Sequence, residues 1–220
     1  MSLKDFDSWL VWYWDMETYY QSWSNYYLKD LSNNWNDWLF SGWLNPTTVW
    51  TLTSWINWKA LSFTNTWNCI DILDRWTWSS LDTSEYTMIF SFRVDKKWPY
   101  WSWMVTKWIY PNYNYTYWIV DRSVTNYVPY TIWPDKKYNY WDLVNISITF
   151  DSDLNKKYYI NWVLARNIKS TTILNNNNLI FWKYIWDNNY QTFWIIDDIK
   201  IYNRALTDQE IAQQAKIAGF

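Results

Sequence analysis

Apolar and polar residues alternate along much of the chain, and this alternation predicts strands. From Tyr86 to Val94, most large apolar residues fall on one side and Thr, Ser and Arg fall mostly on the other. The order V-N-I-S-I-T-F from Val144 to Phe150 is the clearest case, and turn residues from Asp151 to Asn155 lead into a return strand from Lys157 to Ala165. Period-two alternation indicates strands with one face on the core, so we expect these strands to be half-buried and to include a hairpin.

Further segments fit the same pattern. They are Leu10–Asp15, Lys59–Phe63, Cys69–Leu73, Trp101–Trp108, Tyr115–Asp121, Leu179–Lys183 and Trp194–Tyr202. One helix is expected at the C-terminal end, where Thr207 and Glu210 have the spacing of a capping box and Leu206 and Ile211 that of a hydrophobic staple. The segment from Tyr19 to Thr53 is interpreted as a long ordered loop. The prediction is an all-β antiparallel sandwich or jelly roll, one domain over residues 1–220, with a short C-terminal helix.

Charge and residue usage exclude several function classes. The formal net charge of -2 offers no basic surface for nucleic acid or for anionic lipid. No apolar run reaches the ~20 residues of a spanning helix, and the first residues lack the pattern of a signal peptide, so export is expected to be directed from outside this chain. With no His and the single Cys69, the common general base and the usual transition-metal ligands are missing. An enzyme is therefore not expected.

The chain contains 24 Trp but only 2 Gly. Average usage near ~7% predicts roughly 15 glycines in a chain of this length. Glycine serves backbone positions with φ > 0, and a β-rich chain needs such positions in its turns. Asn supplies some of them here, but Trp is poorly suited to that role.

Six segments, in order, resemble the laminin-G-like, concanavalin A-type jelly-roll domains, and one of them is Val144–Asp151, which resembles the strand before the family's hairpin. The closing stretch Trp194–Thr207 resembles that family's final signature, and Tyr159–Leu164 resembles its Y-V-N-G-V-L hairpin. Asn57–Phe63 resembles N-G-K-A-L-S-F, Asp30–Trp38 resembles D-L-S-G-N-G-N-x-G, and Leu10–Asp15 resembles its L-V-G-Y-W opening. The resemblance covers nearly the whole chain and implies a concanavalin A-like lectin-glucanase sandwich.

The departures from the family pattern share one form, Trp in place of Gly. They are Trp12, Trp35, Trp38, Trp58, Trp162, Trp182 and Trp194. Random drift does not repeatedly exchange the smallest side chain for the largest. We hypothesise that the gene comes from a bacterial lineage that reads the codon UGA as glycine, and that these tryptophans are glycines in the native protein. The alternative is an unusually aromatic protein.

Asp197 is the first candidate for site chemistry. In a strand from Ile195 to Ile201 it is expected to share a face with Ile195, Ile199 and Ile201, while Asp198 lies on the other face with Lys200. A buried carboxylate must be paired, hydrogen-bonded or metal-bound, and calcium takes oxygen ligands alone. The family resemblance also implies a structural calcium that joins the closing strand to the opening segment. The candidate calcium ligands beside Asp197 are Asp15, Glu17, Asp30 and Asn36. Alternatively, Asp197 bonds to backbone N–H groups or Tyr hydroxyls.

The candidate sugar-stacking residues are Tyr110, Tyr113, Tyr115 and Tyr117. Strand packing is the alternative for these tyrosines. The expected function is a non-catalytic carbohydrate-binding or adhesion module of a bacterial cell-surface or secreted protein, with a glycan or cell-surface ligand as partner, no nucleic acid and no membrane insertion. A structural domain of a pilin-like assembly is a second hypothesis. A glycoside hydrolase is a third, although Glu17, Glu85 and Glu210 form no E-x-D-x-x-E run.

Overall fold

The computed structural model describes most of the predicted strands and the helix. Its described residues are 8–32, 34–39, 50–55, 58–63, 70–72, 85–94, 102–109, 112–120, 123–126, 143–169, 179–181 and 194–217. Side chains are described for 8–32, 34–38, 85–93, 143–169 and 195–217, and elsewhere the backbone alone is described.

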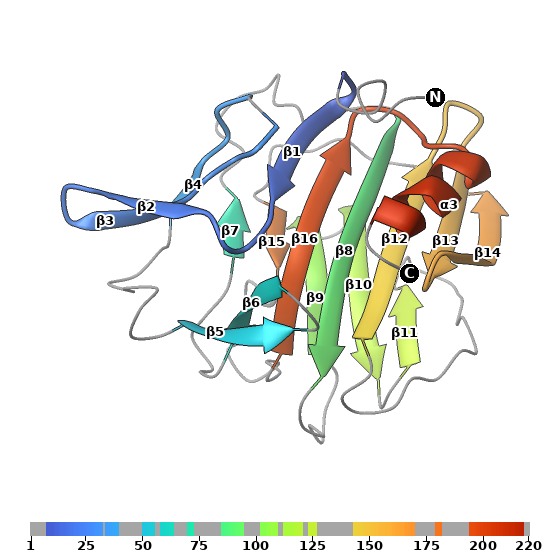
Figure 1. Ribbon diagram of the computed structural model, residues 1–220. Coiled ribbons are helices and arrows are strands. Elements are labelled where there is room, and N and C mark those ends of the chain that lie inside the picture. The colour runs from blue at the N-terminus through green and yellow to red at the C-terminus, as the bar shows by residue number, and fades with distance from the viewer. Residues whose placement is uncertain are drawn as a thin grey trace.

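Two antiparallel sheets form a sandwich. The large sheet runs in the order β14 (Val163–Lys169), β13 (Asn155–Ile160), β12 (Leu143–Phe150), β8 (Tyr86–Val94), β16 (Trp194–Tyr202), β6 (Trp58–Phe63), β5 (Trp50–Trp55), with β1 (Leu10–Trp14) paired to β16. The second sheet runs in the order β11 (Ser123–Asn126), β10 (Asn112–Val120), β9 (Ser102–Ile109), β15 (Leu179–Phe181), β7 (Ile70–Ile72). Figure 1 shows the second sheet behind the large one, with helix α3 (Asp208–Ile217) across the front. The predicted all-β sandwich with a short C-terminal helix is confirmed.

A small third sheet projects from the sandwich as an arm (Figure 1). It contains β2 (Tyr19–Ser22), β3 (Asn25–Leu28) and β4 (Trp38–Leu39) in that order. The interpretation of residues 19–53 as one long loop is therefore wrong. Polar residues and aromatic residues are mixed on both faces of this hairpin, so the segment lacks the clear alternation that predicts a half-buried strand.

The core of the sandwich lies between the two large sheets. Phe90 on β8 pairs with Ile146 on β12, and both are buried. Tyr86 stacks on Phe150 at 5.7 Å between ring centroids. These side chains come from the apolar face that the sequence pattern predicted.

The opposite face of the large sheet is buried as well, which corrects the prediction of half-buried strands. A cluster of Ile89, Tyr159 and Tyr202 on this outer face packs against Leu206 and Ile211 from the C-terminal segment. Residues 86–92 and 144–150 are buried at every position, and the C-terminal segment covers this face at Ile89. The C-terminal segment packs on the face of the strands that was predicted to be exposed. The sequence of either strand alone does not indicate this contact.

The C-terminal helix begins with the predicted capping box. The Thr207 N–H donates to Glu210 Oε2 at 2.8 Å, and the Glu210 N–H donates to Thr207 Oγ1 at 3.3 Å. Arg204 adds two bonds of 2.7 and 2.8 Å to the Glu210 carboxylate. These contacts fix the start of α3 on the sheet.

Among the described residues, three tryptophans have backbones in the left-handed region. Trp23, Trp35 and Trp162 have φ of 57°, 61° and 67°. Trp23 is the first residue of the two-residue turn between the paired Ser22 and Asn25. Trp162 follows Asn161, whose φ is 48°, in the turn between β13 and β14. Such two-residue hairpins favour Gly, and Asn-Gly most of all.

Two other tryptophans at proposed glycine positions are accommodated in the interior. Trp12 and Trp38 are each 4% exposed. Trp12 makes an edge contact with Trp14 at 5.1 Å between ring centroids.

The single-domain extent over residues 1–220 stays a prediction. No helix in the described part of the chain is both long and apolar enough to cross a bilayer.

Candidate functional site

A bulge in β16 places Asp197 differently from the prediction. The pairing of β16 with β8 shifts register between Asp197 and Lys200, and Asp198 has a φ of 53°. The extra residue reverses the alternation, so Asp197 lies on the outer face with Lys200, while Ile199 and Ile201 lie on the core face. The prediction that Asp197 shares a face with these two isoleucines is therefore wrong. Its carboxyl is still buried, with the residue 8% exposed.

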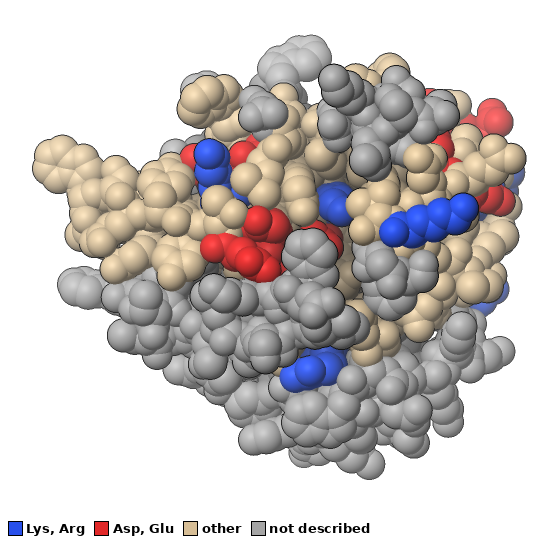
Figure 2. All heavy atoms as spheres, in the orientation of Figure 1, with Lys and Arg blue, Asp and Glu red and all other residues tan. Residues whose placement is uncertain are grey.

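Four carboxyl groups gather where β1 lies against β16. Asp15 and Glu17 follow β1, and Asp197 and Asp198 lie in the bulge of β16. Burial, together with the charges of Asp198, Glu17 and Asp15, raises the pKa of Asp197 from 3.8 to about 8. Figure 2 shows acidic side chains grouped on this face of the molecule, beside the arm. The structure thus brings Asp15 and Glu17, two of the candidate calcium ligands, near Asp197.

Tyr13 and Lys200 complete this acidic cluster. The Tyr13 hydroxyl donates to Asp198 Oδ1 at 3.1 Å, and Lys200 Nζ lies 4.0 Å from the same oxygen. Lys200 Nζ also lies 4.9 Å from the centroid of the Tyr13 ring. Burial raises the pKa of Tyr13, and the neighbouring Asp198 raises it further. Asp197 Oδ1 accepts the Asp198 N–H at 2.8 Å.

The donor set of this cluster suits a hard cation because it offers only oxygens. A buried carboxyl with a raised pKa would gain from a cation that stabilises its charged form. As the side chains stand, no three acidic, His or Cys residues of the described part are arranged to hold a metal ion. The calcium site stays a prediction.

Asp30 and Asn36 belong to a separate network. The Asp30 carboxylate accepts N–H groups of Tyr13, Ser32 and Asn36 at 3.1, 2.9 and 3.0 Å. Asn36 Nδ2 donates to the Val11 carbonyl at 3.0 Å. These bonds dock residues 30–32 and 34–37 on β1, so the structure gives both residues a role in holding that loop.

The side chains of the predicted sugar-stacking tyrosines all lie outside the described part of the structure. Tyr113, Tyr115 and Tyr117 lie on β10, opposite Trp108, Lys107 and Val105 of β9. The pairing shifts register between Tyr113 and Tyr115. Tyr110 lies outside the described residues, so this prediction stays untested.

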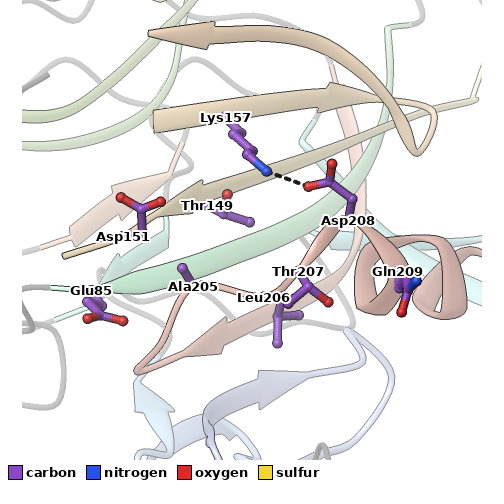
Figure 3. Close-up of a pocket in the computed structure, with 9 residues that line it drawn as sticks. All are labelled: Glu85, Thr149, Asp151, Lys157, Ala205, Leu206, Thr207, Asp208 and Gln209. Carbon is purple, nitrogen blue, oxygen red and sulfur yellow. Dashed lines mark hydrogen bonds and ion pairs between the residues drawn. The ribbon is translucent and has the colours of Figure 1, made fainter. Parts of the chain in front are cut away.

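A groove beside the start of α3 was not predicted (Figure 3). Its volume is about 610 Å³. The residues that line it are Glu85, Thr149, Asp151, Lys157, Ala205, Leu206, Thr207, Asp208 and Gln209. Lys157 Nζ lies 2.6 Å from Asp208 Oδ1, which also accepts the Tyr159 hydroxyl at 2.7 Å. The lining can exchange hydrogen bonds with a polar ligand, but no local sequence pattern links its four segments.

The arm carries a pair of stacked aromatic rings. Tyr20 and Tyr27 lie opposite each other in the β2–β3 hairpin, with ring centroids 5.3 Å apart and planes 14° apart. The Tyr20 hydroxyl donates to Asp37 Oδ2 at 2.8 Å. The sequence interpretation missed this pair because it treated the whole segment as loop.

No family model matches this sequence, and no curated protein sequence matches it either. Several solved structures are similar in fold. The binding domain of Paraclostridial Mosquitocidal Protein 1 is 18% identical with a TM-score of 0.70, over 96% of this chain and 52% of that chain. The botulinum neurotoxin serotype D binding domain is 13% identical with a TM-score of 0.68, over 97% of this chain and 52% of that chain.

A sialidase has a similar fold over a smaller share of its length. The Trypanosoma rangeli sialidase in complex with sialic acid is 11% identical with a TM-score of 0.71, over 94% of this chain and 33% of that chain. The chain is a β-sandwich. It spans about half of the toxin binding domains and about a third of the sialidase. At these identities the likeness shows the fold alone. The laminin-G-like assignment remains a resemblance in sequence, within a sandwich that is shown.

Proposed function

We propose that this chain is a non-catalytic carbohydrate-binding or adhesion module of a bacterial protein that works outside the cell or on its surface. The observation that carries the proposal is that nearly the whole chain superimposes on two toxin domains described as binding domains. The sialidase complex adds a similar fold in a protein that binds sialic acid. The proposed partner is therefore a glycan or a glycan-bearing surface.

The use of the described carboxylates supports a binding role. Asp15, Asp30 and Asp151 each accept backbone N–H groups and so stabilise turns and loops. Asp197 has the raised pKa of a general acid, but it is buried and bonded to the Asp198 N–H. Glycoside hydrolysis needs two carboxyls accessible to the sugar and ~5–5.5 Å or more apart. Burial of Asp197 argues against that use.

Calcium is proposed as a stabilising ion. Asp197 would hold it, with Asp15 and Glu17 from the segment after β1 as partners, because these carboxylates converge on one junction. The ion would favour the charged form of Asp197 and tie β16 to the opening segment. Asp30 and Asn36 fit this role less well because their polar atoms already hold the loop.

We also propose that many of the tryptophans are glycines in the native protein, through reassignment of UGA. Trp23 and Trp35 are 97% and 90% exposed at positive φ, so packing does not compensate the left-handed conformation there. The intact mass of the natively expressed protein tests the proposal, because each exchange of Trp for Gly lowers the mass. A mass that matches 24 tryptophans would refute it.

The binding proposal is tested on a glycan array, with calcium and with chelator. Binding that chelator weakens is the expected result. Association of the protein with itself and no glycan binding would instead favour the structural domain of a surface assembly. Turnover of a glycan that is lost on replacing one Asp would favour a glycoside hydrolase.

A further inference from the structure

The β2–β3 hairpin of the arm contains no charged residue. Residues Tyr19–Leu28 contain four tyrosines, and the other six are Gln, Ser, Trp, Ser, Asn and Leu. Figure 2 shows the outer part of the arm free of acidic and basic side chains, whereas both kinds occur on the sandwich beside it. The nearest charge along the chain is Lys29, at the base of the hairpin.

Tyr20 is held in place on this arm although it is 40% exposed. Its ring stacks on Tyr27, and its hydroxyl donates to Asp37 Oδ2 at 2.8 Å. Asp37 is itself fixed because its Oδ1 accepts the Asp30 N–H at 2.8 Å. The bond to Asp37 is the main reason that the pKa of Tyr20 rises to about 12. A ring fixed before binding loses little side-chain entropy when a ligand stacks on it.

The residues around the ring add hydrogen-bonding groups. Ser22 and Asn25 form the next pair on the same face of the hairpin, two positions beyond Tyr20 and Tyr27. Both are close to the turn, and Asn25 is exposed. An aromatic ring face beside a hydroxyl and an amide offers both parts of sugar recognition, stacking against C–H groups and hydrogen bonds to hydroxyls.

We propose that this face of the arm binds an uncharged sugar ring, with Tyr20 as the stacking surface and Ser22 and Asn25 as hydrogen-bonding partners. The inference rests on the proposed carbohydrate-binding function and names the surface and the class of glycan. An acidic glycan is disfavoured because the charged group in contact with Tyr20 is the Asp37 carboxylate. Tyr20 binds the sugar through its ring, since its hydroxyl is engaged by Asp37.

The groove beside α3 is a weaker candidate for the same ligand. Asp208 Oδ1 already accepts Lys157 and Tyr159. The Asp151 carboxylate accepts three bonds from Asn155 and one from the Asp153 N–H. A sugar in the groove would compete with these bonds, whereas a sugar on the arm would not disturb the bond that fixes Tyr20.

The test compares variants on an array of neutral and acidic glycans, followed by titration with a neutral glycan that the full chain binds. Tyr20→Ala is expected to weaken affinity roughly tenfold or more, in line with loss of an aromatic anchor. Tyr20→Phe keeps the ring and is expected to retain most of the affinity. Tyr26→Ala is the matched control, since Tyr26 pairs with Gln21 on the opposite face of the hairpin. Glu85→Gln is the control for the groove.

The variant Trp23→Gly tests whether glycan binding by the arm depends on the exposed tryptophan at its tip. Trp23 lies at the tip of the hairpin, and the proposed surface does not use it. Binding is therefore expected to survive this exchange. Far-ultraviolet circular dichroism and thermal unfolding of each variant confirm that the fold is intact.

The results distinguish failure of the arm as the binding surface from failure of the proposed carbohydrate-binding function. Neutral-glycan binding that Tyr20→Ala leaves unchanged would overturn the arm as the binding surface while the proposed function stands. Binding of acidic glycans alone would overturn the uncharged class of ligand. Self-association that Tyr20→Ala abolishes, without glycan binding, would show that the arm binds a second copy. If the unaltered chain binds no glycan, the proposed function fails first.

Discussion

Asp197 is expected to couple the stability of the fold to pH, and under the proposed calcium site also to calcium. Its pKa in the folded chain is about 8, against 3.8 for an ordinary Asp. Between these values the folded state retains a proton that the unfolded state has lost. The free energy of unfolding therefore falls as the pH rises from about 4 to 8. At about 1.36 kcal/mol per pH unit, the contribution reaches at most about 5–6 kcal/mol above pH 8.

The assay is denaturant unfolding at pH 5 and pH 8, with calcium and with chelator, on the unaltered chain and on Asp197→Asn. The unaltered chain is expected to lose stability between pH 5 and 8 in chelator and to recover much of it in calcium, because the ion stabilises the charged carboxylate. Asp197→Asn is expected to show a flatter profile and no calcium effect.

Asp30→Asn serves as the control for this experiment. It removes a buried carboxylate that accepts backbone N–H groups, so the variant is expected to be less stable while its calcium response remains. If the unaltered chain and Asp197→Asn show the same pH profile and neither responds to calcium, the reasoning about Asp197 is refuted.

Other substitutions test strain, burial and capping. Trp23→Gly is expected to be about 1 kcal/mol more stable than Trp23→Ala, because Ala keeps the Cβ that disfavours the left-handed region; equal melting temperatures would contradict this. Lys156 is buried, and burial lowers its pKa to about 8. Between pH 8 and about 10.5 the unfolded state holds the extra proton, so the free energy of unfolding is expected to rise with pH relative to that of Lys156→Met; parallel pH profiles would disprove it. Glu210→Gln weakens the pair with Arg204 and the capping box, and urea unfolding at pH 7 is expected to show a loss of about 1–3 kcal/mol. An unchanged midpoint would argue against that role.

Local patterns predicted the parts of the fold that depend on neighbouring residues. The capping box at Thr207 and Glu210 marked the start of α3, and alternation marked β8 and β12. The turn residues after Phe150 correctly placed the turn between β12 and β13. The predicted return strand Lys157–Ala165 is wrong in its extent, because the chain turns again at Asn161 and Trp162 between β13 and β14. These features follow from spacings of a few residues, which the sequence displays directly.

Features that depend on distant contacts escaped prediction. The polar side of β8 is buried because α3, more than a hundred residues later, packs on Ile89. The bulge at Asp198 reverses the faces of β16, and it can be seen only in the pairing with β8. For the site, the charges of Asp15 and Glu17 act on Asp197, whereas Asp30 and Asn36 hold their own loop. The calcium ligand set itself stays a prediction.

The most direct test of the proposed function is a glycan array probed with the purified chain in the presence of calcium. The bound glycans are then recovered and their masses are measured by mass spectrometry. The account predicts binding to a defined group of glycans whose masses are unchanged afterwards. Absence of binding to every glycan, or recovery of cleaved products, would contradict a non-catalytic sugar-binding module.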